Sequence, residues 1–81
     1  MSRARDVVEV VARALADQPD AVRVNERESK GQTVVELSMA PGDLGRVIGR
    51  QGRTAAAIRT LVALAAELDG TRATVDFRDD H

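Results

Sequence analysis

The sequence contains no cysteine, tryptophan or tyrosine, a single phenylalanine, and a single histidine at position 81. Without cysteine the chain cannot form a disulfide, a thiolate metal site or a thiol nucleophile. The serines have no histidine or lysine base in a recognisable arrangement, and the acidic pair Asp79-Asp80 is expected to lie in a solvated tail. We therefore expect no enzymatic activity, no metal and no cofactor.

Long apolar segments are also missing. No stretch approaches the roughly 20 apolar residues that a helix needs to cross a bilayer. The N-terminus runs from Met1 through Arg3 and Arg5 without the apolar region of a signal peptide. The 81 residues suffice for one small hydrophobic core. We expect a single domain over residues 1–81, with a core of about residues 3–78 and short frayed tails, located in the cytoplasm and without membrane contact.

Acidic and basic residues are nearly balanced in number but unevenly distributed. Twelve basic and 13 acidic residues give a formal net charge of -1, which by itself disfavours a nucleic-acid-binding protein. Between Leu44 and Ala66, however, there are four arginines and no acidic residue, whereas the remaining 8 basic and 13 acidic residues give -5. The sequence therefore predicts one electropositive segment on an otherwise acidic protein, and arginine suits contacts to phosphates and bases.

The first helix is predicted from an apolar period of 3.6 residues. Between Arg3 and Asp17 the apolar positions form one helical stripe, which we expect to face the core. Pro19 ends this helix, because proline lacks the N–H of the helical ladder and disfavours helical geometry in the preceding residue. The stripe consists of Val7, Val8, Val11, Ala14 and Leu15.

Two strands joined by a turn follow, and their period is two. Val22 and Val24 alternate with polar neighbours, and the alternation resumes after the polar stretch from Glu28 to Gln32, where we expect the turn. In the second strand the inward positions are expected to be Val35, Leu37 and Met39, and the outward positions Val34, Glu36 and Ser38.

Two helices and a third strand complete the chain. Asp43 is expected to cap a short helix that stops at Gly49, and a long helix begins at Arg53 and ends near Asp69-Gly70. The inner side of the short helix is expected to consist of Leu44, Val47 and Ile48. One apolar face of the long helix consists of Ile58, Leu61, Val62, Ala65 and Leu68. A strand over 72–78 directs Ala73, Val75 and Phe77 inward.

The resulting order, helix–strand–strand–helix–helix–strand, predicts an α+β fold in two layers. Three helices with apolar stripes need a common surface to cover, and a three-stranded sheet with one apolar face provides it.

The segment Gly49-Arg50-Gln51-Gly52, between the two later helices, carries the functional prediction. Glycines permit a tight turn and let phosphates approach main-chain N–H groups, and the N-terminus of the following helix favours an anion. Arg50, Arg46 and Arg53 add charge-assisted contacts to phosphate oxygens. This combination favours a nucleic-acid backbone as the ligand.

Three other interpretations of this segment are open. The glycines can simply end one helix and begin the next. Gly52-Arg53-Thr54 resembles the end of a mononucleotide P-loop. The first glycine of that motif would fall at Val47, however, and its lysine is replaced by Arg53. A DNA-reading helix-turn-helix fits residues 44–68 in outline, but its second helix offers alanines and Ile58 where polar side chains are needed.

The extended motif Asp43–Thr54, continued by Ala57–Val62, resembles the signature of the small single-KH bacterial proteins of the KhpA family, formerly called YlqC. The order of elements over nearly the whole chain is that of a type II KH domain. The resemblance implies a non-catalytic RNA chaperone or post-transcriptional regulator that binds single-stranded RNA and no small-molecule substrate. It also implies a homodimer, or a heterodimer with a larger KH protein of the Jag type.

Site residues follow from the resemblance by position. Gly49 to Gly52 would form the phosphate-clamping loop, which in KH domains holds about four nucleotides. Ile48 would line the bottom of the binding groove, and Thr54 belongs to the motif. Arg46, Arg53 and Arg59 would be flanking basic contacts. A competing function is that of a protein-interaction subunit whose RNA site is weak or vestigial.

Two features qualify the expected strength of binding. The family tends to carry lysines where this chain has Ala56 and Ala63, so we expect weaker binding, with a log–log salt slope on single strands of roughly -2 to -3. Avidity from a dimer would compensate. The long helix has a second apolar flank, which is either a dimer surface or simply buried: Ala57, Leu61, Leu64 and Leu68.

Overall fold

The computed structural model describes residues 2–78. Its elements are, in chain order, α1 (Arg3–Leu15), η1 (Pro19–Ala21), β1 (Arg23–Ser29), β2 (Gln32–Ser38), α2 (Pro41–Ile48), η2 (Arg50–Gly52), α3 (Arg53–Leu68) and β3 (Ala73–Arg78). This order confirms the predicted α+β architecture of three helices and a three-stranded sheet. The predicted frayed tail from Asp79 to His81 lies outside the described residues.

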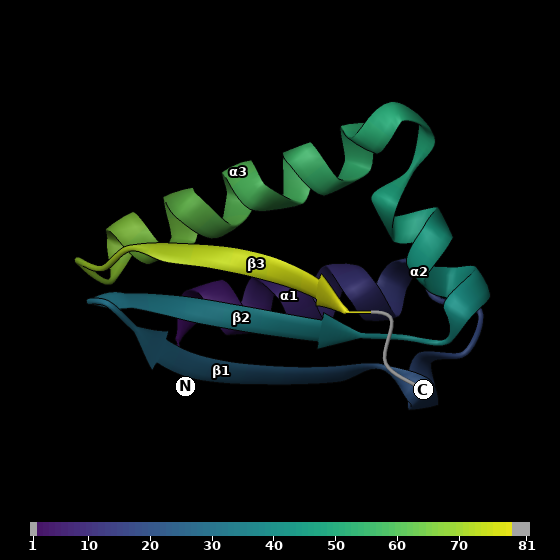
Figure 1. Ribbon diagram of the computed structural model, residues 1–81, viewed down its shortest axis with the longest axis horizontal. Helices are drawn as coiled ribbons and strands as arrows, with labels where there is room; N and C mark the ends of the chain where they lie inside the picture. Colours follow the sequence, from purple (N-terminus) through teal and green to yellow (C-terminus); the bar gives the residue numbers. More distant parts are fainter. Residues whose placement is uncertain (1, 79–81) are drawn as a thin grey trace.

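The sheet is mixed and has the order β1-β2-β3. β1 and β2 are antiparallel, whereas β2 and β3 are parallel, so the chain between them crosses over through α2 and α3. The helices lie on one side of the sheet, and α3 runs along β3 (Figure 1). The turn between β1 and β2 is shorter than predicted, because Lys30 and Gly31 both have positive φ and close a two-residue hairpin.

α1 faces the core with a stripe that is rotated from the predicted one. The buried residues are Ala4, Val8 and Ala12, whereas Ala14 is exposed and the other predicted positions are only partly buried. The physical reason is that small side chains let the helix approach the sheet closely. Charged residues occupy the flank toward β1, where Arg5 Nη2 donates to the Val24 carbonyl oxygen at 3.5 Å.

β2 is the central strand. Its core face is buried, and its outer face is buried as well at Val34. Leu37, Val35 and Met39 face the core as predicted, but Val34 was expected on the solvent side and is only 6% exposed. Its neighbours in register are Arg27 of β1 and Thr74 of β3. We attribute this burial to the flanking cross-strand side chains, because an arginine stem covers adjacent apolar surface.

α3 buries small and β-branched residues and exposes leucines. Its buried positions are Ala55, Ile58, Val62, Ala65 and Ala66. Leu61 and Leu68, which were predicted to face the core, are 46% and 73% exposed. The 3.6-residue period alone could not separate the core stripe from the apolar flank beside it.

Candidate nucleic-acid interface

The predicted loop joins the C-terminus of α2 to the N-terminus of α3 at one end of the molecule (Figure 1). Three of its four residues, Gly49, Gln51 and Gly52, have positive φ values of 76°, 58° and 70°. Such a conformation reverses the chain within one short 3₁₀ turn. The loop residues therefore come together as predicted, directly before the first turn of α3.

The two loop glycines are required for different reasons. A Cβ atom at Gly49 would lie 2.6 Å from Thr54 Oγ1 and 2.9 Å from Thr54 Cβ, whereas one at Gly52 would meet nothing within 4 Å. Gly49 therefore needs both its backbone conformation and the absence of a side chain. Thr54, which the motif assigned to the site, packs against Gly49 and supports the bend.

α2, which leads into the loop, is anchored by a buried carboxylate. Asp43 was predicted to cap α2, but the helix begins two residues earlier, at Pro41. The Asp43 side chain is buried and accepts hydrogen bonds from the main-chain N–H groups of Gln18, at 2.9 Å, and Asp17, at 3.1 Å. These bonds hold the pKa of Asp43 below its usual value.

The predicted arginines are in two different environments. Arg46 is bound to Asp17, with its Nη1 and Nη2 atoms 3.0 and 2.9 Å from the two carboxylate oxygens. Arg53 Nη2 donates to Gln51 Oε1 at 3.1 Å, on the loop itself. Among residues 2–78, no carboxylate forms an ion pair with Arg50, Arg53 or Arg59. The structure therefore separates Arg46 electrostatically from the other predicted contacts.

The N-terminus of α3 adds the partial positive charge of backbone N–H groups to the arginines around the loop. α1 has a side-chain cap, in which Ser2 Oγ accepts from Arg5 N at 3.1 Å, whereas the N-cap of α3 is Gly52, which has no side chain to accept a hydrogen bond. The first N–H of α3, that of Arg53, donates to the Arg50 carbonyl oxygen. The first N–H groups of a helix have no partner within the helix and attract anions. Ile48, which was predicted on the inner side of α2 with Leu44 and Val47, is 38% exposed. It is the last residue of α2, directly before the loop, and offers an apolar side chain there.

Sequence reasoning placed Phe77 in the core and did not assign it to the site. The Arg59 guanidinium lies over the Phe77 ring, with 5.1 Å between Cζ and the ring centroid. Phe77 is only partly buried and lies on the edge strand β3, near its C-terminal end. The signal in the sequence was that Phe77 is the only aromatic residue of the chain.

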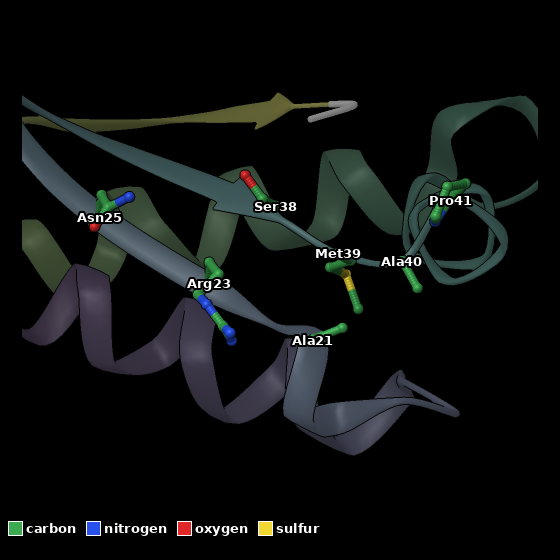
Figure 2. A pocket seen from close by; sticks show the side chains of 7 residues that line it. All are labelled: Ala21, Arg23, Asn25, Ser38, Met39, Ala40 and Pro41. Atoms are coloured by element: carbon green, nitrogen blue, oxygen red, sulfur yellow. The ribbon is translucent and has the colours of Figure 1, made fainter. Parts of the chain in front are cut away.

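A hollow of about 400 Å³ lies elsewhere, between the start of β1 and the connection from β2 to α2. Figure 2 shows its lining, which includes none of the predicted site residues. It adjoins Pro41, the first residue of α2, whereas the loop follows the last residue of that helix. The Arg23 guanidinium at the hollow donates to the carbonyl oxygens of Asp20, at 2.8 Å, and Val22, at 3.1 Å. The lining residues are Ala21, Arg23, Asn25, Ser38, Met39, Ala40 and Pro41.

Residues 2–78 contain neither a candidate metal site nor a membrane-spanning helix. That part of the chain has no cluster of three or more histidine, aspartate or glutamate side chains able to hold a metal ion. None of its helices combines the length and the apolar character needed to span a membrane.

Comparison with known proteins is consistent with this geometry. Residues 5–77 match the family described as KhpA/KhpB, KH domain. The chain is 49% identical over 72 residues to the RNA-binding protein KhpA of Caldanaerobacter subterraneus subsp. tengcongensis, covering 89% of this chain and 96% of that one. It is 51% identical over 70 residues to the protein of the same name from Leifsonia xyli, covering 86% and 90%. For that of Mycobacterium tuberculosis, the identity is 53% over 58 residues, covering 72% of each chain.

Proposed function

Because the chain belongs to the KhpA/KhpB KH-domain family, we propose that it binds single-stranded RNA through the loop Gly49–Gly52. Family membership also shows that it is not an enzyme. We expect it to act in the cytoplasm as an RNA chaperone or post-transcriptional regulator. The proposal rests on three features at one end of the molecule: arginines without an ion-pair partner among residues 2–78, an N-terminus of α3 without a side-chain cap, and a bend in which Gly49 has no room for a side chain.

The chemistry of this end suits a phosphate backbone. Arg50 belongs to the loop that directly precedes α3, so a phosphate bound there would accept hydrogen bonds from main-chain N–H groups in the first turn of α3 and charge-assisted ones from the Arg50 guanidinium. Gln51 and Arg53 are tied to each other at 3.1 Å, which limits their side-chain motion and lowers the entropy lost on binding. The exposed side chain of Ile48 supplies an apolar floor for a base.

Arg46 contributes less than the sequence suggests. Its two hydrogen bonds to Asp17 must be broken, or shared, before it can contact a phosphate. The salt slope should therefore lie toward the shallow end of the expected range, roughly -2 for three phosphates on a single strand.

The test is fluorescence anisotropy of a labelled single-stranded RNA at two salt concentrations. The variant Arg50→Asp/Gln51→Asp reverses the charge of the loop and retains both glycines. Aspartate tolerates positive φ better than most residues, so position 51 should keep its conformation. We expect loss of the salt-sensitive signal in a variant whose circular dichroism is unchanged.

A matched control is Arg23→Asp/Asn25→Asp, which makes the same change in charge at the hollow of Figure 2. Arg23 and Asn25 are exposed, like Arg50 and Gln51. Loss of binding only in this control would transfer the RNA site to the hollow. Equal binding by all three proteins would exclude the loop, and no binding by any would favour a protein-interaction subunit. Preference for a duplex DNA over the RNA would favour a DNA-binding function.

We also propose that the exposed apolar flank of α3 is a dimer surface. Leu61, Leu64 and Leu68 are 46%, 53% and 73% exposed, so the alternative that this flank is buried within one copy is wrong. Val10 of α1, the helix packed against α3, is also exposed, at 69%. A second copy would cover these side chains and give two RNA sites per particle, which raises apparent affinity.

Light scattering with Leu64→Glu tests the dimer. The wild type should show a dimeric mass, and the variant a monomeric one, because a glutamate would be buried without a partner. Ala63→Glu is the control, since this position is exposed on the opposite flank of α3. A monomeric mass for all three proteins would exclude the homodimer and favour pairing with a Jag-type protein.

A further inference from the structure

We propose that Arg59 and Phe77 form a platform on which one unpaired RNA base stacks, and that this contact, rather than charge, is the role of Arg59. This inference rests on the proposed RNA-binding function and adds a base-binding subsite to the phosphate-binding loop.

The first observation is that the two side chains form a layered pair. The Arg59 guanidinium lies over the ring of Phe77, 5.1 Å from the centroid. Phe77 packs against the core and pairs in register with Leu37, which is fully buried, so the lower layer has a fixed position. A guanidinium that rests on an aromatic ring presents its other planar side outward, and RNA bases stack on such planes.

The second observation is that the upper layer is open. Arg59 forms no ion pair within residues 2–78. Its neighbours one helical turn away on the same side of α3 are Ala56 and Ala63, whose side chains are a single methyl group. Longer side chains at these positions would cover the guanidinium. Among residues 2–78, these two neighbours therefore leave the exposed Arg59 side chain accessible to a flat base.

The third observation is the distance from the loop. Arg59 follows Gly52 by seven residues along the sequence and α3, which corresponds to roughly 10 Å along the helix axis. A KH domain holds about four nucleotides, so a strand clamped at the loop extends far enough to bring a base to Arg59. Phe77 lies on the edge strand β3, and α3 runs along this strand (Figure 1).

A purely electrostatic role for Arg59 predicts different behaviour. A phosphate contact depends on charge and is retained in Arg59→Lys. A stacked contact depends on the planar guanidinium, and lysine has none. Phe77→Leu removes the lower layer while keeping an apolar side chain that fills much of the same space.

The experiment measures binding of a short labelled RNA, about four to six nucleotides long, and of versions in which one nucleotide at a time lacks its base. In the wild type, one position should show a loss of affinity of roughly fivefold or more, as expected for one stacked base. In Arg59→Lys this position-specific loss should disappear, while the salt slope stays the same. Phe77→Leu should reduce it partially.

Three outcomes are distinguished. A position-specific loss that persists in Arg59→Lys, or a wild type without any such position, would overturn the platform and leave the loop proposal intact. A wild type that binds none of the RNAs would overturn the proposed function and the platform with it. Loss of the positional effect in Arg59→Lys and its partial reduction in Phe77→Leu, with a preserved salt slope, would support the platform.

Discussion

The arginines around the loop and those in the rest of the molecule have the same chemistry but different partners. On the outer face of the sheet, Glu36 accepts from Arg27 of β1 at 2.9 Å and from Arg78 of β3 at 2.7 Å, so one carboxylate ties both edge strands to β2. The Arg27 and Arg78 guanidinium groups hold the pKa of Glu36 below its usual value. Arg50 and Arg59, by contrast, form no ion pair within the described residues.

This difference shows that a count of positive charges does not locate a binding surface. An arginine held by a carboxylate contributes little net field and must lose its partner before it contacts a phosphate. The overall charge of -1 is therefore compatible with RNA binding. Within residues 2–78, acidic side chains pair with Arg27 and Arg78 of the sheet and with the arginines of α1, but not with Arg50, Arg53 or Arg59. Arg46 is the intermediate case, near the loop by sequence but paired with Asp17.

The largest expected effect concerns the backbone of the loop rather than its charge. Gly49→Ala should lower the free energy of unfolding by about 3 kcal/mol or more, because it combines a glycine-type conformation with a clash against Thr54. Gly52→Ala should cost only about 1–2 kcal/mol, since its Cβ meets no neighbour. Urea denaturation measures both. Equal costs would mean that the contact with Thr54 is not what requires glycine at position 49.

The second prediction contrasts one arginine from each region. Arg50→Ala should weaken binding of a single-stranded RNA by roughly tenfold, as expected for one charge-assisted contact, and should reduce the log–log salt slope by about 0.7. Arg27→Ala removes the same charge from the sheet and should leave affinity nearly unchanged. Anisotropy titrations compare them. Equal losses would show that only total charge matters and would remove the distinction between the two regions.

A smaller effect is expected when a paired arginine is released. Asp17→Asn removes the carboxylate that holds Arg46 and should raise RNA affinity by roughly two- to threefold, the equivalent of about 0.5 kcal/mol for one exposed charge contact. Asp20→Asn makes the same change in net charge on the adjacent turn and serves as the control. The same increase in both variants would indicate a general charge effect and no specific role of the ion pair.

The last prediction concerns the stability contributed by Asp43, which should change with pH only under acidic conditions. Asp43 has a folded-state pKa below its ordinary value of 3.8, so the unfolded chain takes up the proton first as the pH falls. The stabilisation by the charged carboxylate is therefore complete above about pH 4 and is lost as the pH falls through the folded-state pKa. Urea unfolding of wild type and Asp43→Asn should differ by a constant amount between neutral pH and pH 5, and this difference should shrink below pH 4. A constant difference down to pH 2 would contradict the assignment.

Much of the fold could be predicted from local patterns. The apolar periods identified all three helices and all three strands, and Gly49, Pro19 and Gly70 marked the ends of the helices. Proline restricts the backbone and glycine adopts positive φ values that other residues rarely reach, and neither property needs a tertiary contact. Errors arose where two faces of one element are both apolar. Leu61 and Leu68 of α3 and Ala14 of α1 were assigned to the core and are exposed, since hydrophobicity alone does not determine how a helix is rotated against its sheet.

The sequence by itself determined the order of the elements, the position of the loop and the concentration of arginines around it, because these depend on residues adjacent in the chain. Only the tertiary structure decided which charges are neutralised. Asp17 and Arg46 pair although they are 29 positions apart in the sequence, and Arg78 and Glu36 pair although they are 42 positions apart. It also placed Arg59 over Phe77. Such pairs form when packed elements bring distant residues together, and no local pattern specifies that approach.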